Sequence, residues 1–221
     1  MSDAIAGDDG THEATVTVFL LRHGRTGLNA SGRLRGRIDT PLDEVGRQQA
    51  AALGRFFAGV PIAALAASPL SRTWDTASAV AESHPGLVPE ADPDLADRDW
   101  GRWAGELEAE VISRFGSLDA APGVEGAAAL AARARRAIER LAGRCGGRPV
   151  VAVAHEAVNR AVISALCGRV GDGELPQPTG CWNQLVSAGG VWSAPVVGAV
   201  PGDGRVPLGA GPLLPGGPLG G

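Results

Sequence analysis

Residues 15–29 read TVTVFLLRHGRTGLN, and the fold depends on this stretch. The β-branched and apolar run 16–21 predicts a buried strand. The next residues are Arg22, His23 and Gly24. Charged side chains are almost never buried in a core unless they are paired. In open α/β sheets, ligands bind beyond the carboxyl ends of the strands. The stretch therefore predicts that the first strand delivers Arg22 and His23 into a binding site.

Strands and helices are expected to alternate along the rest of the chain. Further strands are predicted over 62–67, 87–90 and 149–154, and in a hairpin formed by 182–188 and 191–197. Helices are predicted over 43–58, 69–82, 106–115, 125–141 and 157–166. This order predicts an α/β fold, a three-layer sandwich in which a mostly parallel sheet has helices on both faces and an antiparallel edge hairpin.

The ends of the chain differ in composition from its middle. Residues 1–14 are acidic and polar, and residues 199–221 are rich in glycine and proline. We expect a disordered lead-in over 1–14, a single domain over 15–198 and a disordered tail over 199–221.

Composition excludes several classes of function. The net charge of −4 gives no general affinity for nucleic acid, and no apolar run is long enough for a membrane span. All 20 basic residues are arginines, so lysine Schiff-base chemistry and a Walker phosphate loop are excluded. The three cysteines have no metal-binding spacing, and the start has no signal-peptide pattern. We expect a cytoplasmic protein without nucleic-acid or membrane partners.

Polar residues follow two of the predicted strands at the same kind of position. His23 follows 16–21 and His155 follows 149–154, while Arg72 lies early in the helix 69–82. If the two strands are neighbours, these side chains and Arg22 lie at one edge of the sheet. Two arginines and two histidines around one pocket favour binding of a phosphate group, because a guanidinium group can donate two hydrogen bonds to phosphate oxygens.

Such a site suits transfer of a phosphoryl group through an imidazole. A histidine can attack phosphorus if it is neutral, and nearby arginines disfavour its protonation. The leaving oxygen then needs a proton and the attacking water needs a base, and one carboxyl group can serve both steps. The acids of residues 92–99 are the candidates.

These residues and their spacing resemble the histidine phosphatase, or phosphoglycerate mutase-like, superfamily. The matching motifs run in order over about residues 16–190: Arg22-His23-Gly24-Arg25-Thr26; Asn29; Gly36, Asp39, Pro41 and Leu42; Ser68-Pro69-Leu70, Arg72 and Thr76-Ala77; Leu95, Asp97, Gly101, Trp103 and Gly105; and His155.

The resemblance implies a role for each matched position. It also implies that the reaction needs no metal or organic cofactor. His23 is the expected nucleophile, and Arg22, Arg72 and His155 are expected to bind the phosphoryl group and stabilise its transition state. Asn29 and the loop around Gly36 are expected to contact the phosphate or the leaving group.

The acid and the residue after the second histidine depart from the family pattern. Asp97 stands where many members have glutamate and is expected to be the acid and then the base, with Asp99 as the alternative. Glu156 stands where a small residue is frequent, and an orienting hydrogen bond is one interpretation of it.

The expected activity is hydrolysis of a small-molecule phosphomonoester. A mutase of the same superfamily is the first alternative, but the segment between Asp97 and His155 is short for one, so water is expected to reach the phosphohistidine. A non-catalytic binder of phosphorylated ligands is the second alternative. The sequence leaves the substrate and the oligomeric state open.

Four other residues have interpretations outside the catalytic set. Ser68 is expected to cap the helix 69–82 at its N-terminus. Arg133 is expected on a solvated helix face rather than at the substrate. Trp100 and Trp103 either line the pocket or pack in the core.

Overall fold

The computed structural model describes residues 15–168 and 175–207. The expected lead-in over 1–14 lies outside the described residues, as do residues 208–221 of the expected tail. Ala199, the first residue of that tail, is buried and still belongs to the last strand. No helix in the described ranges is long and apolar enough to cross a membrane.

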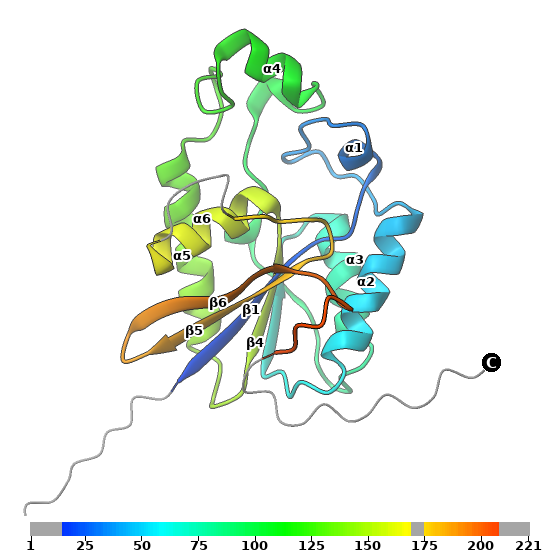
Figure 1. Ribbon diagram of the computed structural model, residues 1–221, viewed down its shortest axis with the longest axis vertical. Helices are drawn as coiled ribbons and strands as arrows, with labels where there is room; N and C mark the ends of the chain where they lie inside the picture. Colours follow the sequence, from blue (N-terminus) through cyan, green and yellow to red (C-terminus); the bar gives the residue numbers. More distant parts are fainter. Residues whose placement is uncertain (1–14, 169–174, 208–221) are drawn as a thin grey trace, which may run out of the picture.

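A six-stranded sheet forms the centre of the molecule (Figure 1). Its strands are β1 Val16–Arg22, β2 Ala64–Ala67, β3 Glu90–Ala91, β4 Val150–Ala154, β5 Trp182–Ala188 and β6 Val191–Ala199. They lie in the order β3-β2-β4-β1-β5-β6, with β3, β2, β4 and β1 parallel and with β5 and β6 antiparallel at one edge. The predicted fold class and edge hairpin are confirmed.

Helices cover both faces of this sheet (Figure 1). They are α1 Gly27–Ala30, α2 Glu44–Phe57, α3 Ser71–Ala81, α4 Glu108–Phe115, α5 Ala127–Ala142 and α6 Glu156–Cys167, with single 3₁₀ turns η1 Pro93–Leu95 and η2 Gly101–Trp103. The apolar faces of α5 and α6 join one hydrophobic cluster with one side of β1 and β4, and those of α2 and α3 join a second cluster with the other side. Alternate side chains of these central strands therefore reach opposite cores.

The register of the central strands explains where the polar residues meet. Arg22 pairs with Ala154 across the parallel β1–β4 ladder. His23 and His155 are the next residues of the two strands, so both leave the sheet at the same edge. The two strands are neighbours, which is the condition under which the sequence placed these side chains at one edge of the sheet.

Helix α3 begins later than predicted, and Ser68 is not its cap. The N-cap is Leu70, which makes no side-chain capping bond. Asp39, from the loop before α2, accepts from the backbone N–H of Ser71 at 2.8 Å and from its hydroxyl at 2.7 Å. A carboxylate distant in sequence thus replaces the local serine as the acceptor at this helix end.

The two tryptophans of the 92–105 stretch are buried in a third, smaller cluster. Trp100 and Trp103 pack with Leu34, Val111 and Ala121 beneath α4. Trp100 also lines the larger cavity described below, whereas Trp103 does not. The core interpretation therefore holds for both residues, and Trp100 serves as a cavity wall as well.

Candidate active site

His23 and His155 form the centre of the site. Both side chains are fully buried, and their ring centroids are 5.2 Å apart with the ring planes at 61°. Each ring follows a strand whose backbone is fixed by the β1–β4 ladder. The pair is therefore held on rigid elements, as a reaction centre requires.

The hydrogen bond of His23 leaves one ring nitrogen available for attack. Its Nδ1 lies 2.6 Å from the carbonyl of Gly24 and donates to it. Nε2 then carries the lone pair, and it is buried without a partner among the described residues. Burial lowers the pKa of His23 well below its usual value, and Arg72 and Arg22 lower it further. Sequence reasoning named the arginines, but burial is the larger cause of the neutral imidazole.

Arg72 is fixed on three sides in the first turn of α3. Its guanidinium donates to the carbonyls of Gly36 at 2.8 Å and Ile38 at 2.9 Å, and to Asp97 Oδ2 at 3.1 Å. Gly36 has a φ of +50°, and a Cβ there would approach Trp100 Cδ1 to 2.8 Å. Gly36 thus accepts from Arg72 through its carbonyl, in a turn that excludes side chains.

Of the two candidate acids, the structure brings Asp97 to the histidines. The residue is 3% exposed, and its carboxyl group lies 3.7 Å from His155 Nδ1. Asp99 is on the surface, where it accepts from Gly101 N–H at 2.8 Å and lies 3.8 Å from Arg37. Burial raises the pKa of Asp97, against the opposing effect of Arg72 and Arg35. A raised pKa suits a carboxyl group that must hold a proton and then release it.

Arg133 holds the backbone around Asp97, so the solvated-face interpretation is wrong for this residue. It is buried and donates to the carbonyls of Asp94, Ala96 and Asp97 at 2.6–3.1 Å. Its guanidinium also pairs with Glu125 at 2.7 Å. Sequence periodicity placed Arg133 off the apolar face, but a long side chain at that face's edge can reach an irregular loop.

Ser68 holds the ring of His155 by a hydrogen bond at Nε2. Its hydroxyl lies 2.9 Å from His155 Nε2 and accepts from the backbone N–H of Leu70 at 3.4 Å. A hydroxyl that accepts from Leu70 can donate to Nε2, which leaves the ring proton on Nδ1. Nδ1 points into the site and has no hydrogen-bond partner among the described residues. His155 is thereby arranged as a donor to an anion.

Glu156 supplies the orienting contact that the sequence suggested. One carboxylate oxygen lies 2.7 Å from Arg22 Nη1, and the other lies 2.8 Å from Arg160. Arg22 Nη1 also donates to the carbonyl of Gln177. These contacts hold the outer side of the Arg22 guanidinium and leave its Nε buried and unpartnered in the described structure.

Asn29 belongs to the short helix α1 and its side chain caps that helix. It ends the first turn of α1, where its side-chain oxygen accepts from the N–H of Thr26 at 3.0 Å and from the Thr26 hydroxyl at 2.9 Å. This reciprocal cap leaves the Asn29 amide nitrogen as the group available to a ligand.

Arg35 is a site residue that sequence reasoning did not select. It lies in the basic loop 24–41, and its charge lowers the pKa of His23, His155 and Asp97. The sequence shows four arginines of similar context in this loop, Arg25, Arg33, Arg35 and Arg37, and it gave no means of choosing among them.

Unpartnered nitrogen atoms converge on the site. Eight buried side-chain polar atoms lack hydrogen-bond partners in the described residues. Five of these atoms belong to the site: Arg22 Nε, His23 Nε2, Arg35 Nε, Arg72 Nε and His155 Nδ1. Buried polar groups normally find partners, so a cluster of unpaired nitrogens indicates a place for an anion.

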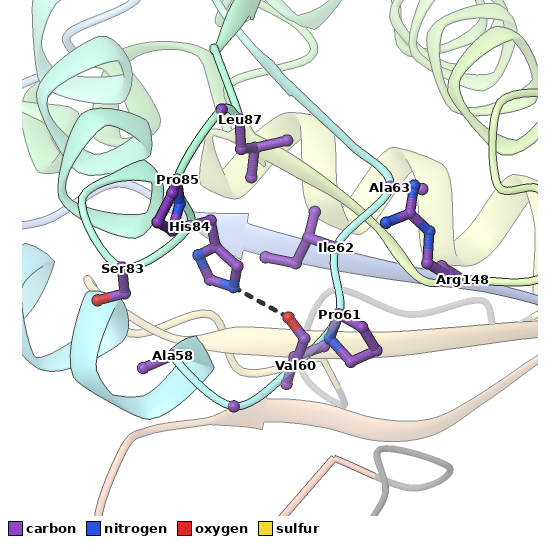
Figure 2. Close-up of a pocket in the computed structure, with 12 residues that line it drawn as sticks. Ala58, Val60, Pro61, Ile62, Ala63, Ser83, His84, Pro85, Leu87 and Arg148 are labelled. Carbon is purple, nitrogen blue, oxygen red and sulfur yellow. Dashed lines mark hydrogen bonds between the residues drawn. The ribbon is translucent and has the colours of Figure 1, made fainter.

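Two cavities of the described structure lie in different parts of the fold. A cavity of about 670 Å³ adjoins the site, with Asp97, Arg35, Trp100 and Glu156 in its walls. A second, of about 450 Å³, lies between the turn after α2 and the turn after α3, where His84 Nε2 donates to the carbonyl of Val60 at 2.9 Å (Figure 2). Only the first cavity reaches the polar cluster. The described residues contain no group of three or more His, Cys, Asp or Glu placed to hold a metal ion.

Comparison with known proteins gives a consistent assignment. Residues 18–198 match the histidine phosphatase superfamily (branch 1). The chain is 31% identical over 192 residues to glucosyl-3-phosphoglycerate phosphatase of Mycobacterium tuberculosis, covering 75% of this chain and 86% of the relative. It is 34% identical over 183 residues to metal-independent phosphoserine phosphatase of Arabidopsis thaliana, covering 76% of each.

A solved structure agrees with these sequence matches. The mycobacterial glucosyl-3-phosphoglycerate phosphatase in complex with VO₃ superposes with a TM-score of 0.75 at 30% identity, covering 83% of this chain and 99% of that one. The motifs, the sheet order and the paired histidines all agree with one assignment: the chain belongs to the histidine phosphatase superfamily.

Proposed function

We propose that this protein hydrolyses a phosphomonoester through a phosphohistidine intermediate on His23. The observation that carries the proposal is the set of unpartnered buried nitrogens on Arg22, His23, Arg72 and His155. The buried carboxyl group of Asp97 lies 3.1 Å from Arg72 and 3.7 Å from His155. The named phosphatases among the relatives support hydrolysis of a phosphomonoester.

In the first step, the phosphoryl group passes from the ester to His23. The lone pair of Nε2 forms a bond to phosphorus as the bond from phosphorus to the ester oxygen breaks. Asp97, whose burial favours the protonated form, gives its proton to the departing oxygen. Arg22, Arg72 and the Nδ1 proton of His155 stabilise the charge on the three phosphoryl oxygens.

In the second step, water takes the place of the alcohol. The Asp97 carboxylate removes a proton from the water as its oxygen attacks phosphorus. The bond to His23 Nε2 breaks, inorganic phosphate leaves, and Asp97 is protonated for the next cycle. The neutral His23 is restored because burial and two arginines keep its pKa low.

The substrate class is a small organic phosphate. The relatives are named for glucosyl-3-phosphoglycerate and phosphoserine, both of which are small phosphorylated molecules. The 670 Å³ cavity beside Asp97 has room for the organic part of such an ester. The three cysteines, all free thiols, favour action in the reducing cytoplasm.

A mutase is the weaker alternative. A mutase must keep its phosphohistidine from water until the isomeric product forms. The chain between Asp97 and His155 contains α4, α5 and short turns. Of these two helices, only α4 lies away from the sheet, over the edge that carries the site (Figure 1). This short segment gives little cover, so water is expected to reach the phosphohistidine.

Phosphate release from a panel of esters tests the proposal. The panel includes an aryl phosphate, O-phosphoserine, 3-phosphoglycerate and sugar phosphates. We expect release by the wild type and none by His23→Ala, with full activity in His84→Ala, whose imidazole lies in the other cavity (Figure 2). No release from any ester would refute hydrolysis. Isomerisation of 3-phosphoglycerate with a bisphosphate primer, without net phosphate release, would favour the mutase.

A further inference from the structure

The loop between α1 and α2 presents Arg35 to the site from a fixed backbone. On one side, buried Leu34 exchanges backbone hydrogen bonds with Gly105 at 2.7 Å and Glu106 at 2.9 Å. On the other side, the Gly36 carbonyl accepts from Arg72. A side chain held between two such anchors is pre-organised, which lowers the entropy lost when it binds a ligand.

The neighbouring arginines of the loop have other partners. Arg33 Nη1 donates to the carbonyl of Gly105 at 2.8 Å. Arg37 is exposed and lies 3.8 Å from Asp99. Arg35 has no carboxylate partner within the described ranges, and its buried Nε has no hydrogen-bond partner there. Its charge acts instead on the catalytic groups.

The charges around the site leave the guanidinium of Arg35 free to face a bound anion. Arg22 is paired with Glu156, and Arg72 contacts Asp97. Glu156 is shared between Arg22 and Arg160, so one carboxylate faces two guanidinium groups. When Asp97 holds the proton that it must donate, neither Arg72 nor Arg35 has a carboxylate partner among the described residues. Their positive charges then face a phosphate monoester, whose charge is roughly −1.5 to −2.

We propose that Arg35 is a third arginine ligand of the transferring phosphoryl group and therefore a catalytic residue. This inference rests on the proposed function. Arg35 and Asp97 both line the 670 Å³ cavity, whereas His23, Arg22 and Arg72 do not. Arg35 thus contacts the phosphoryl oxygens from the side of the leaving group, while Arg22 and Arg72 bind from the side of the sheet.

Binding of inorganic phosphate to the full chain, measured by calorimetry, tests Arg35 without turnover. Arg35→Gln should weaken phosphate binding by roughly tenfold to a hundredfold, the effect of losing hydrogen bonds to a charged group. Arg37→Gln, two residues away on the same loop, is the matched control and should change it by less than about twofold, as expected of a weak surface pair. Equal affinities in the two variants would overturn the proposal.

Ester hydrolysis separates a phosphoryl ligand from a ligand of the leaving group. Arg35→Gln should lower kcat/KM by a similar factor for an aryl phosphate, glycerol phosphate and O-phosphoserine, because all share the phosphoryl group. A loss confined to O-phosphoserine, with phosphate binding unchanged, would overturn the proposal by assigning Arg35 to the carboxylate of the leaving group.

Thermal unfolding distinguishes a loss of phosphate binding from a loss of folded structure. Arg35→Gln should not lower Tm in phosphate-free buffer, because no described hydrogen bond is lost and charge repulsion decreases. Should the glutamine variant unfold, Arg35→Lys keeps the charge but loses the guanidinium fork, and it should still bind phosphate more weakly than wild type. If wild type binds phosphate through Arg35 but hydrolyses no ester, hydrolysis fails and the anion site stands.

Discussion

Replacing Asp97 with asparagine tests the acid and base roles in one variant. Asparagine has nearly the same shape and keeps one oxygen, which can accept from the Arg98 N–H or from Arg72 but not from both, since these donors bond to different oxygens of Asp97. It cannot give a proton to a leaving oxygen or take one from water. Because Asp97 is 3% exposed, bulk water has little access to substitute for it.

The size of the loss should depend on the leaving group. For an alkyl ester, kcat/KM should fall by about 10²- to 10⁴-fold, the usual contribution of general acid catalysis. For an activated aryl ester, kcat/KM should change little, because an aryl oxide leaves without a proton. kcat should fall for both esters, because hydrolysis of the phosphohistidine still needs the base.

Rapid-mixing kinetics with p-nitrophenyl phosphate supply the assay. Asp97→Asn should show a burst of about one equivalent of p-nitrophenol followed by slow turnover, the signature of a covalent intermediate that accumulates. Asp99→Asn is the matched control and should show neither effect, since Asp99 faces Arg37 and solvent. Equal losses of kcat/KM on alkyl and aryl esters would refute the acid role of Asp97. A large loss on alkyl esters with little change on aryl esters in Asp99→Asn would assign the acid role to Asp99.

Three further predictions concern the histidines and the residues that hold the site. Because His23 and His155 have pKa values below those of the unfolded chain, stability is full above about pH 6.5 and decreases as the pH falls, by up to about 1.4 kcal/mol per pH unit for each histidine. Urea unfolding at several pH values checks this, and His155→Asn should reduce the slope. Ser68→Ala should lower kcat by roughly threefold to tenfold through the lost hydrogen bond to His155, and unchanged kcat would show that the tautomer does not depend on Ser68. Gly36→Ala should cost about 1–3 kcal/mol in a denaturant titration, since φ is +50° and the new Cβ would meet Trp100; a neutral effect would mean that the loop relaxes freely.

Most of the framework could be predicted because local patterns carry it. The apolar run before His23 and the run before His155 each form a buried strand at the predicted place. The helix that carries Arg72 was also predicted, although its first turn begins at Ser71. These elements are specified by periodicity and punctuation over a few residues, which a sequence displays directly.

The positions that were mispredicted or missed depend on contacts between distant segments. Ser68 looked like a helix cap because it precedes a proline, but the cap interaction comes from Asp39 and the serine hydroxyl serves His155. Arg133 looked solvated because its helix face is polar, but it reaches the carbonyls around Asp97. A local pattern cannot reveal a partner that lies tens of residues away.

The sequence by itself determined the α/β architecture and the motifs that place His23, Arg22, Arg72 and His155 at the ends of neighbouring elements. The resemblance favoured Asp97 as the acid and kept Asp99 as the alternative, and the tertiary structure shows that Asp97 is the one that lies beside His155. Periodicity could not separate the two, because both carboxyl groups lie on an irregular segment. It also shows that Arg35, among the arginines of the loop 24–41, has a buried Nε without a hydrogen-bond partner in the described residues. In both cases the deciding quantity is burial and the presence or absence of a partner, and those arise only when separate segments pack together.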